Sequence, residues 1–310
     1  MYLARRNLPD FHFIVEFEKA KHVVGGLPVI EARHQLEYER YFSDPEKPWR
    51  IFADIQESGF IERMDVSYPK LDEVASVLGA ATVSEAYEIK PLISDVASGN
   101  PNDLRMVNSG TIDRYHLLWG EKVFRYLKDG YSNPIIEAAN HSKLPATRLN
   151  QARTPKIIVA GMTKILECGV DIDGTVLAGK STVVVMPLRN DDLLYLLAIL
   201  NSSLISYWYN TVYGGNKLSG GYLRIGRSQI ASIPIRAIDF DNPTDKIAYN
   251  EVVKAVQSML NLQKRLAAAS GANKGVIEQQ ITLTDRKINM LVYKLYGLTN
   301  EEIAIVEEYS

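Results

Sequence analysis

The sequence is poor in the residues from which metal sites and disulfides are built. Its 310 residues include one cysteine, Cys168, which excludes an internal disulfide and a cysteine-based zinc cluster. The apolar neighbours of Cys168 indicate a half-buried thiol on a strand, and a single thiol fits a reducing, cytoplasmic setting. None of the five histidines has the His-x-Glu or His-Glu-x-x-His spacing of a metal enzyme. We therefore expect no bound metal.

Long apolar runs are also missing. The first ten residues lack the apolar stretch of a signal peptide. The most apolar segment, 193–209, is interrupted by Asn201 and by Ser202, Ser203 and Ser206. This segment is short for a membrane span and is typical of a buried helix. We expect a cytoplasmic protein without membrane contact.

The sequence lacks the usual motifs of base methylation and nucleotide binding. No Asn/Asp-Pro-Pro-Tyr/Phe tetrapeptide, which holds the amino group of a flipped base, is present, and the nearest string is Asn100-Pro101-Asn102-Asp103. The glycine-rich segment 214–221 follows a predicted helix rather than a strand, so it lacks the context of a dinucleotide, S-adenosylmethionine or phosphate-binding loop. We expect no catalytic residue and no cofactor site here, although folding can unite groups that are distant in sequence.

Charge is distributed unevenly along the chain. Hydrophobic residues make up 46% and charged residues 23%, a globular composition, and the formal net charge is −2. Residues 1–100 hold 11 Lys/Arg against 17 Asp/Glu, a net of −6, whereas residues 141–227 hold 10 against 5, a net of +5. A local positive excess is what phosphate contact requires. Ordinary variation of surface charge also produces patches of this size.

The pattern of apolar residues predicts several strands. The clearest are 156–160 and 182–186, two β-branched runs bounded by glycine or proline. The turn between them, 171–174, places Gly174 where a positive φ is needed. The charged segment 31–41 is a candidate short helix. Weaker strand candidates are 11–15, 27–30, 49–52 and 133–137.

Helical periodicity dominates the second half of the chain. Residues 193–208 carry apolar side chains at helical spacing, and a loop with four glycines follows at 213–222. Residues 248–269 and 276–295 predict an αα-hairpin, and a capping box at 299–302 begins a last short helix. We predict an α+β fold with a twisted, mostly antiparallel sheet, packed helices and a C-terminal αα-hairpin.

The glycine-rich loop combines backbone freedom with aromatic and basic side chains. Lys217 lies inside it, Tyr222 ends it, and Arg224 and Arg227 follow. Arginine can pair with O6 and N7 of guanine, and asparagine with adenine, and each such pair contributes about 1–3 kcal/mol of discrimination. This composition suits insertion into a DNA groove. A surface loop whose tyrosines pack on the core would explain it equally well.

Several segments occur in an order that is known from one family. Residues 196–205 read Leu-Leu-Ala-Ile-Leu-Asn-Ser-Ser-Leu-Ile, and Gly-Tyr-Leu-Arg-Ile at 221–225 and Ile-Pro-Ile at 233–235 follow the glycine-rich loop. Further upstream, Gly110 precedes Ile112-Asp113-Arg114-Tyr115. Together these segments resemble the TaqI-like C-terminal specificity domain. That domain is the target recognition domain of DNA adenine methyltransferases and Type IIG restriction–modification enzymes, and it is related to Type I specificity subunits.

The resemblance extends over about residues 68–310, since 72–77 resembles the opening of these domains and 287–302 resembles the C-terminus of the fused enzymes. It implies a segment at 1–67 that joins a methyltransferase core, a target recognition domain at 68–240 and a helical hairpin at 241–310. The motifs of the catalytic core are missing from this sequence. S-adenosylmethionine is therefore expected on a partner catalytic domain.

The resemblance favours a module that recognises double-stranded DNA for a methyltransferase core domain or subunit, directing adenine methylation or cleavage that is performed elsewhere. The C-terminal helices are a candidate interface for a homodimer. We assign phosphate contacts to Lys143, Arg148, Arg153, Lys156 and Lys180. We assign base reading and groove contact to Asn216, Lys217, Tyr222, Arg224 and Arg227.

Two other functions stay open. A nuclease or split methyltransferase whose active site is completed by a partner would depend on Mg²⁺ or S-adenosylmethionine, and a thermal shift on adding S-adenosylmethionine would distinguish it. An interaction protein would use the αα-hairpin to dimerise or to dock a methyltransferase subunit. The apolar stripes of the hairpin can instead pack on the domain core, which is the commoner arrangement.

Overall fold

A computed structural model describes residues 14–24, 27–37, 55–96, 99–214 and 217–309. The chain divides into two compact units, Met1–Gly59 and Phe60–Ser310. Both units contain antiparallel strands, and the second also contains the C-terminal helices. The predicted α+β class with a mostly antiparallel sheet is therefore confirmed.

The first unit contains an antiparallel hairpin of two long strands. β1 (Ile14–Val24) pairs with β2 (Leu27–Glu37), and the register shifts around Ala20. The helix expected from residue 31 is replaced by strand as far as Glu37, because pairing with β1 satisfies the backbone groups of this segment. The strand predicted at 49–52 lies outside the described residues.

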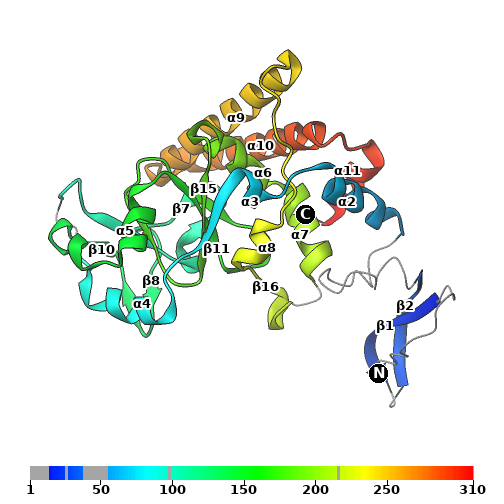
Figure 1. The fold of residues 1–310 in the computed structure, drawn as a ribbon, viewed down its shortest axis with the longest axis horizontal. Helices are drawn as coiled ribbons and strands as arrows, with labels where there is room; N and C mark the ends of the chain where they lie inside the picture. The colour runs from blue at the N-terminus through cyan, green and yellow to red at the C-terminus, as the bar shows by residue number, and fades with distance from the viewer. Residues whose placement is uncertain (1–13, 25–26, 38–54, 97–98, 215–216, 310) are drawn as a thin grey trace. The chain divides into compact units, whose positions relative to one another are not determined.

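The second unit is built around a four-stranded antiparallel sheet (Figure 1). Alternate residues of its strand β11 enter two different cores, with Ile157 and Val159 on one face and Ile158 and Ala160 on the other. A strand that is covered on both faces has no polar alternation, which explains its continuous apolar sequence. In spatial order the strands are β13 (Cys168–Asp171), β11 (Lys156–Ala160), β15 (Thr182–Pro187) and β3 (Ala75–Gly79).

Cys168 lies deeper than its sequence context indicates. Its side chain on β13 is fully buried rather than half-buried, and the main core surrounds it. Burial raises the pKa of the Cys168 thiol well above its ordinary range. The thiol is therefore protonated and acts as a small apolar group.

A second four-stranded sheet contacts the first where β14 meets β15. This sheet is mixed, because β14 runs parallel to β5 while the other strand pairs are antiparallel. Short helices α4 (Val83–Ile89) and α5 (Ala146–Arg153) help to enclose its core. The strands are β14 (Val176–Ala178), β5 (Leu104–Val107), β10 (Ile135–Ile136) and β4 (Ile93–Ser94). Gly174, in the turn before β14, has φ of 64°, as its sequence predicts.

Short elements connect these sheets. Three pairs of strands form separate ribbons: β6 (Ile112–Asp113) with β7 (His116–Leu117), β8 (Phe124–Tyr126) with β9 (Asp129–Tyr131), and β12 (Met162–Thr163) with β16 (Leu223–Arg224). Short 3-10 helices are η1 (Lys90–Leu92), η2 (Ser109–Thr111), η3 (Ala138–Lys143), η4 (Asn190–Asp192) and η6 (Ser219–Gly221).

The apolar helix predicted at 193–208 is two helices. α6 (Leu193–Asn201) ends where Ser202 adopts an extended conformation, and α7 (Ser203–Tyr213) begins there. The Ser202 hydroxyl accepts a hydrogen bond from the Ile205 amide, 3.2 Å away, and so caps α7. Other helices of the chain are α2 (Ile55–Ser67), α3 (Leu71–Val74) and α8 (Arg227–Ala231).

The C-terminal part is the predicted αα-hairpin. α9 (Pro243–Ala267) and α10 (Ala272–Leu295) pack against each other, and α9 also packs on α6 (Figure 1). The capping box that begins α11 (Asn300–Tyr309) is formed, since Thr299 and Glu302 exchange side-chain and backbone hydrogen bonds. In the described part of the chain no helix is both long and apolar enough to cross a membrane.

Candidate nucleic-acid interface

The β12–β16 ribbon, which we define as residues 162–164 and 222–224, lies where β11 ends and β15 begins (Figure 1). Met162 is paired with Arg224, and Thr163 with Leu223. Thr163 and Leu223 are buried, whereas Met162 and Arg224 are exposed. Because side chains alternate along each strand, one face of the ribbon is fixed to the core and the other faces solvent.

Gly161 fixes the ribbon to the end of β11. Its N–H donates to the Ser109 hydroxyl, 2.9 Å away, and its carbonyl accepts from the Ile225 N–H at 3.0 Å. A Cβ at this position would lie 2.1 Å from the carbonyl oxygen of Ser181. Only glycine therefore allows the ribbon to approach the sheet this closely.

The second strand of the ribbon is held from beneath by a helix. The hydroxyl of Tyr209, which is buried on α7, donates to the carbonyl of Arg224 at 3.1 Å. Burial raises the pKa of Tyr209, so this phenol keeps its donor proton at neutral pH. The backbone of Arg224 is thus tied to the core while its side chain is exposed.

An aromatic ring and a cation occupy the outer end of the ribbon. Tyr222 is 41% exposed, and the Lys164 ammonium lies 5.8 Å from the centroid of its ring. Lys164 and Tyr222 are each two residues from the paired Met162 and Arg224, so they belong to the same outward row. The outer face therefore presents thioether, guanidinium, ammonium and phenol groups side by side.

Two more of the predicted cations lie around the ribbon. Arg227 begins α8, and its Nε donates to the carbonyl of Val77 at 2.9 Å, which fixes an otherwise exposed side chain. Lys180 precedes Ser181, whose carbonyl accepts from the Ser109 hydroxyl beside Gly161. Within the described residues no carboxylate forms an ion pair with the basic side chains of this surface, Lys164, Lys180, Arg224 and Arg227.

Lys156 does not reach this surface. Its side chain is 0% exposed, and its ammonium is paired with the Asp171 carboxylate inside the fold. It also donates to the carbonyls of Ala152, at 3.0 Å, and Thr154, at 3.2 Å. The phosphate contact expected of Lys156 is incompatible with this burial.

Arg148 is occupied within the fold as well. Its guanidinium donates to the Glu85 carboxylate at 3.1 Å and to the Gly79 carbonyl at 2.6 Å. Desolvation acts to raise the pKa of Glu85, but hydrogen bonds from Thr82 and the pair with Arg148 together outweigh it and lower the pKa. Arg148 therefore joins α5 to β3 and α4, and it is a poor candidate for phosphate contact.

The other predicted phosphate contacts lie apart from the ribbon. Arg153, at the end of α5, donates to the Asn102 carbonyl at 2.7 Å and lies 3.2 Å from the ring of His141. Lys143 donates to Asn140 at 2.9 Å. Both side chains are exposed, but Arg153 is near the Lys156 end of β11, opposite the end that carries the ribbon.

The two ends of the glycine-rich loop have different neighbours: Lys217 lies near α11, and Tyr222 belongs to the ribbon. Asn216 lies outside the described residues. Lys217 is exposed, and its ammonium lies 5.9 Å from the ring centroid of Tyr309 on α11. Leu218 pairs with Tyr222 through a backbone hydrogen bond of 2.8 Å. Of the predicted loop residues, Tyr222 and Arg224 belong to the ribbon, and Lys217 faces the C-terminal helix.

Met162 and Lys164 belong to this surface, although neither residue stands out in the sequence. Both follow Gly161 with one buried residue, Thr163, between them. The position of this short segment after a glycine that ends an apolar run was the one local signal, because Met162-Thr163-Lys164 has no apolar–polar alternation that would place Thr163 inward. Its meaning depended on Leu223 and Arg224, which are about sixty positions away and complete the ribbon.

Two of the motif residues that resemble the family, Arg114 and Asn201, have structural roles. Arg114 donates to both carboxylate oxygens of Asp285 on α10, at 2.9 and 2.6 Å, and to the carbonyl of Asn201 at the end of α6. The Asn201 amide exchanges two hydrogen bonds with the backbone of Cys168. These residues hold the sheet, α6 and the hairpin together rather than forming part of the exposed surface.

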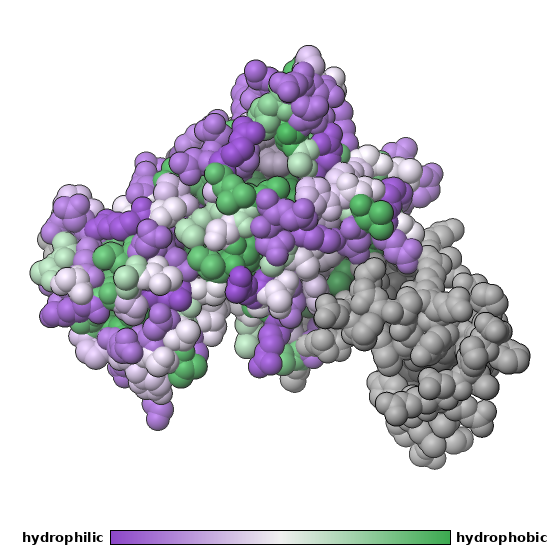
Figure 2. All heavy atoms as spheres, viewed as in Figure 1, coloured by the Kyte–Doolittle hydropathy of each residue, from purple (hydrophilic) through white to green (hydrophobic). Residues whose placement is uncertain are grey.

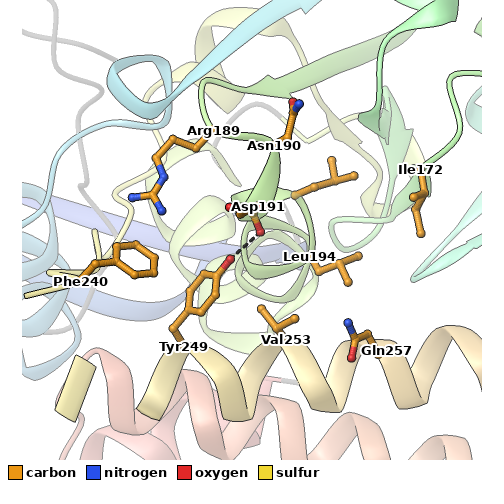
Figure 3. A pocket seen from close by; sticks show the side chains of 10 residues that line it. Ile172, Arg189, Asn190, Asp191, Leu194, Phe240, Tyr249, Val253 and Gln257 are labelled. Atoms are coloured by element: carbon orange, nitrogen blue, oxygen red, sulfur yellow. Dashed lines mark hydrogen bonds between the residues drawn. The ribbon is translucent and has the colours of Figure 1, made fainter. Parts of the chain in front are cut away.

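A pocket of about 430 Å³ lies elsewhere, between the start of α6 and α9 (Figure 3). Tyr249 donates to the Asp191 carbonyl at 2.5 Å, and the guanidinium of Arg189 lies 4.1 Å from the Phe240 ring centroid. These polar groups are already partnered, and most of the remaining lining is aliphatic. Figure 2, drawn in the view of Figure 1, shows apolar side chains gathered among polar ones on one face of the second unit. The charged residues of the lining are Arg189 and Asp191, and a guanidinium, which stays protonated, cannot exchange a proton with the carboxylate. We therefore place the candidate site at the ribbon.

The fold and the ribbon define a mixed α/β domain with a cationic surface mounted on a rigid sheet. Residues 106–235 match the family model of the TaqI-like C-terminal specificity domain, which confirms the resemblance seen in the sequence. The matched segment contains both strands of the ribbon. No curated protein matches the chain. The family match supports a DNA-recognition specificity module of restriction–modification enzymes that works with a catalytic partner.

Proposed function

We propose that this chain selects a DNA sequence by placing the outer face of the β12–β16 ribbon in the major groove. A two-stranded ribbon fits the roughly 12 Å width of that groove. The observation that carries the proposal is the division of the ribbon into a buried face, with Thr163 and Leu223, and an exposed face, with Met162 and Arg224. The backbone is fixed by the core, so the outer side chains are presented in one orientation.

Adenine methylation or cleavage would be carried out by a separate catalytic domain or subunit, which would also bind S-adenosylmethionine. In this proposal Arg224 reads a base edge, because arginine pairs with O6 and N7 of guanine. Lys164, Lys180 and Arg227 neutralise phosphates at the rims of the groove. Phosphate contacts set position and base contacts specify sequence. Loss of a base-reading residue should therefore change the sequence preference, whereas loss of a phosphate-binding residue should lower the affinity for every sequence.

Binding of the full chain to duplexes selected from a random pool tests this assignment. Arg224→Ala should relax the preference at one base pair, at a cost of about 1–3 kcal/mol for the preferred sequence. Lys180→Ala should weaken all sequences alike and reduce the slope of log K against log salt by about 0.9. Lys254→Ala, an exposed lysine of α9, is the matched control. If Arg224→Ala kept both the affinity and the preference of the parent, the ribbon would not be the reader.

We also propose that α10 carries the contact with a second copy of the chain. Val276, Leu283 and Met290 are exposed on this helix and are seven residues apart, so they form one stripe. Antiparallel pairing of two such stripes would place Leu283 at the twofold axis. Light scattering should show a dimer that Leu283→Asp converts to monomer, while Val66→Asp, at an exposed apolar residue of α2, leaves it dimeric. A parent that stays monomeric at high concentration contradicts this interface.

A further inference from the structure

Met162 is an apolar side chain on the exposed face of the ribbon. It is 51% exposed, and it lies directly across the ribbon from Arg224 on the same outward face. Its neighbours along that face are Lys164 and Tyr222. Successive side chains of a strand point to opposite faces. Because Thr163 points to the buried face, Met162 points to solvent.

The chemistry of this pair differs from that of a phosphate-binding patch. An arginine distinguishes guanine by two hydrogen bonds, whereas an apolar side chain distinguishes a pyrimidine by contact with its 5-methyl group. Cβ atoms of directly paired residues lie about 4.5–5.5 Å apart, and neighbouring base pairs are about 3.4 Å apart along the helix axis. Met162 and Arg224 can therefore reach two adjacent base pairs at once.

The mounting of the pair limits its movement. The backbone of Met162 follows Gly161, which is hydrogen-bonded to Ser109 and Ile225, and the backbone of Arg224 is bonded to Tyr209. A reading group that is held by buried neighbours discriminates better, because little ordering is needed on binding.

We infer that Met162 determines specificity by contacting the 5-methyl group of a pyrimidine in the base pair next to the guanine read by Arg224. The chemical group recognised is the methyl of thymine or of 5-methylcytosine. This inference rests on the proposed function, and it adds the second half of a two-base-pair recognition element to it.

Removal of single methyl groups from the DNA tests the inference with the full chain. A duplex selected from a random pool is remade with deoxyuridine in place of each thymine in turn, and in a second series with 5-methylcytosine in place of each cytosine. For the parent, one deoxyuridine next to the guanine whose preference Arg224→Ala abolishes should weaken binding about fourfold, as expected for one buried methyl group. If the site contains cytosine there, 5-methylcytosine should strengthen binding by a similar factor, which distinguishes the two sources of the methyl group.

The same duplexes are then bound to Met162→Ala, which should show no difference between thymine and deoxyuridine. Ile165→Ala, which removes an exposed apolar side chain just beyond the ribbon, is the control and should keep the parental difference. A methyl effect that persists in Met162→Ala, or a parent that binds specifically but responds to no methyl group, overturns the inference and leaves the proposed function intact. A parent without any sequence preference overturns the proposed function itself.

Discussion

Lys156 and Asp171 form an ion pair inside the fold. The ammonium donates to the carboxylate, which also accepts from the backbone N–H groups of Thr175, at 3.0 Å, and Val176, at 2.9 Å. Burial lowers the pKa of Lys156, and the neighbouring carboxylate opposes that shift. A buried pair persists only where each charge has several partners. Here the pair fixes the turn after Asp171 to the start of β11, so its role is structural.

Glu167 is the carboxyl group whose titration should affect stability near neutral pH. Desolvation and the like charge of Asp113 raise its pKa to about 7, against the weaker effects of Lys122 and Arg114. The folded state therefore holds this proton more tightly than the unfolded state does. The resulting stabilisation is fully present below pH 4.5, the ordinary value, and is lost as the pH rises through about 7.

Urea unfolding of the parent and of Glu167→Gln checks this prediction, because glutamine resembles the protonated carboxyl group. The parent should lose stability relative to Glu167→Gln between pH 5 and pH 8. A difference between the two proteins that is the same at both pH values would contradict the raised pKa.

At the scale of elements, the sheet and the C-terminal hairpin meet at one arginine. Arg114 follows β6, Asp285 lies in the middle of α10, and the carbonyl of Asn201 ends α6. Three elements that are distant in sequence are therefore linked by one guanidinium. The side chains of Arg114 and Asp285 are each less than a quarter exposed, so water screens this pair less than a surface pair.

A double-mutant cycle on Arg114→Ala and Asp285→Ala should give a coupling free energy of about 1.5–3 kcal/mol in urea unfolding. The exposed pair Lys274–Glu278 on the same helix, with 4.0 Å between the charged atoms, is the comparison and should couple by less than about 0.5 kcal/mol. Equal coupling in the two cycles would mean that the hairpin is held by its apolar contacts alone.

The sequence predicts elements well where one local signal is strong. The runs at 156–160 and 182–186 are strands, and the capping box at Thr299 begins a helix. It predicts less well where a distant group decides the structure. The helix breaks at Ser202, next to Asn201, whose side chain is hydrogen-bonded to the backbone of Cys168, thirty-three residues away. The helical spacing of the apolar residues continues through this position and does not show the break.

The candidate site shows the same limit. The sequence predicts DNA contact for Arg224 and Tyr222 from their residue types near a glycine-rich loop. The two residues do share the outer face of the ribbon. Lys156 has the same charge as its exposed neighbours, and its burial depends on Asp171 in another strand. Met162 becomes informative only after pairing with Arg224 is known. The excess of lysine and arginine in the sequence therefore indicates the region that carries the surface, but it does not show which residues are exposed there.

At the scale of the whole molecule, the main core of the second unit extends beyond the segment that resembles the family. It includes Phe60, Ile61 and Met64 of α2, which are at most 2% exposed. Phe60 stacks on Tyr207 of α7 with 5.6 Å between ring centroids, and Tyr309 of α11 packs against the same ring. The two ends of the second unit thus meet on α7, although the domain boundary predicted from the sequence lies at residue 68.

Two fragments, 55–310 and 68–310, should therefore differ greatly in stability. Each of the three buried side chains of α2 contributes about 1.5–3 kcal/mol, and a typical domain has only about 5–15 kcal/mol in total. We expect 55–310 to unfold cooperatively in urea and 68–310 to be largely unfolded, as followed by circular dichroism. If 68–310 unfolded at the same urea concentration as 55–310, α2 would be dispensable for the core, and the DNA-recognition unit would begin where its resemblance to the family begins.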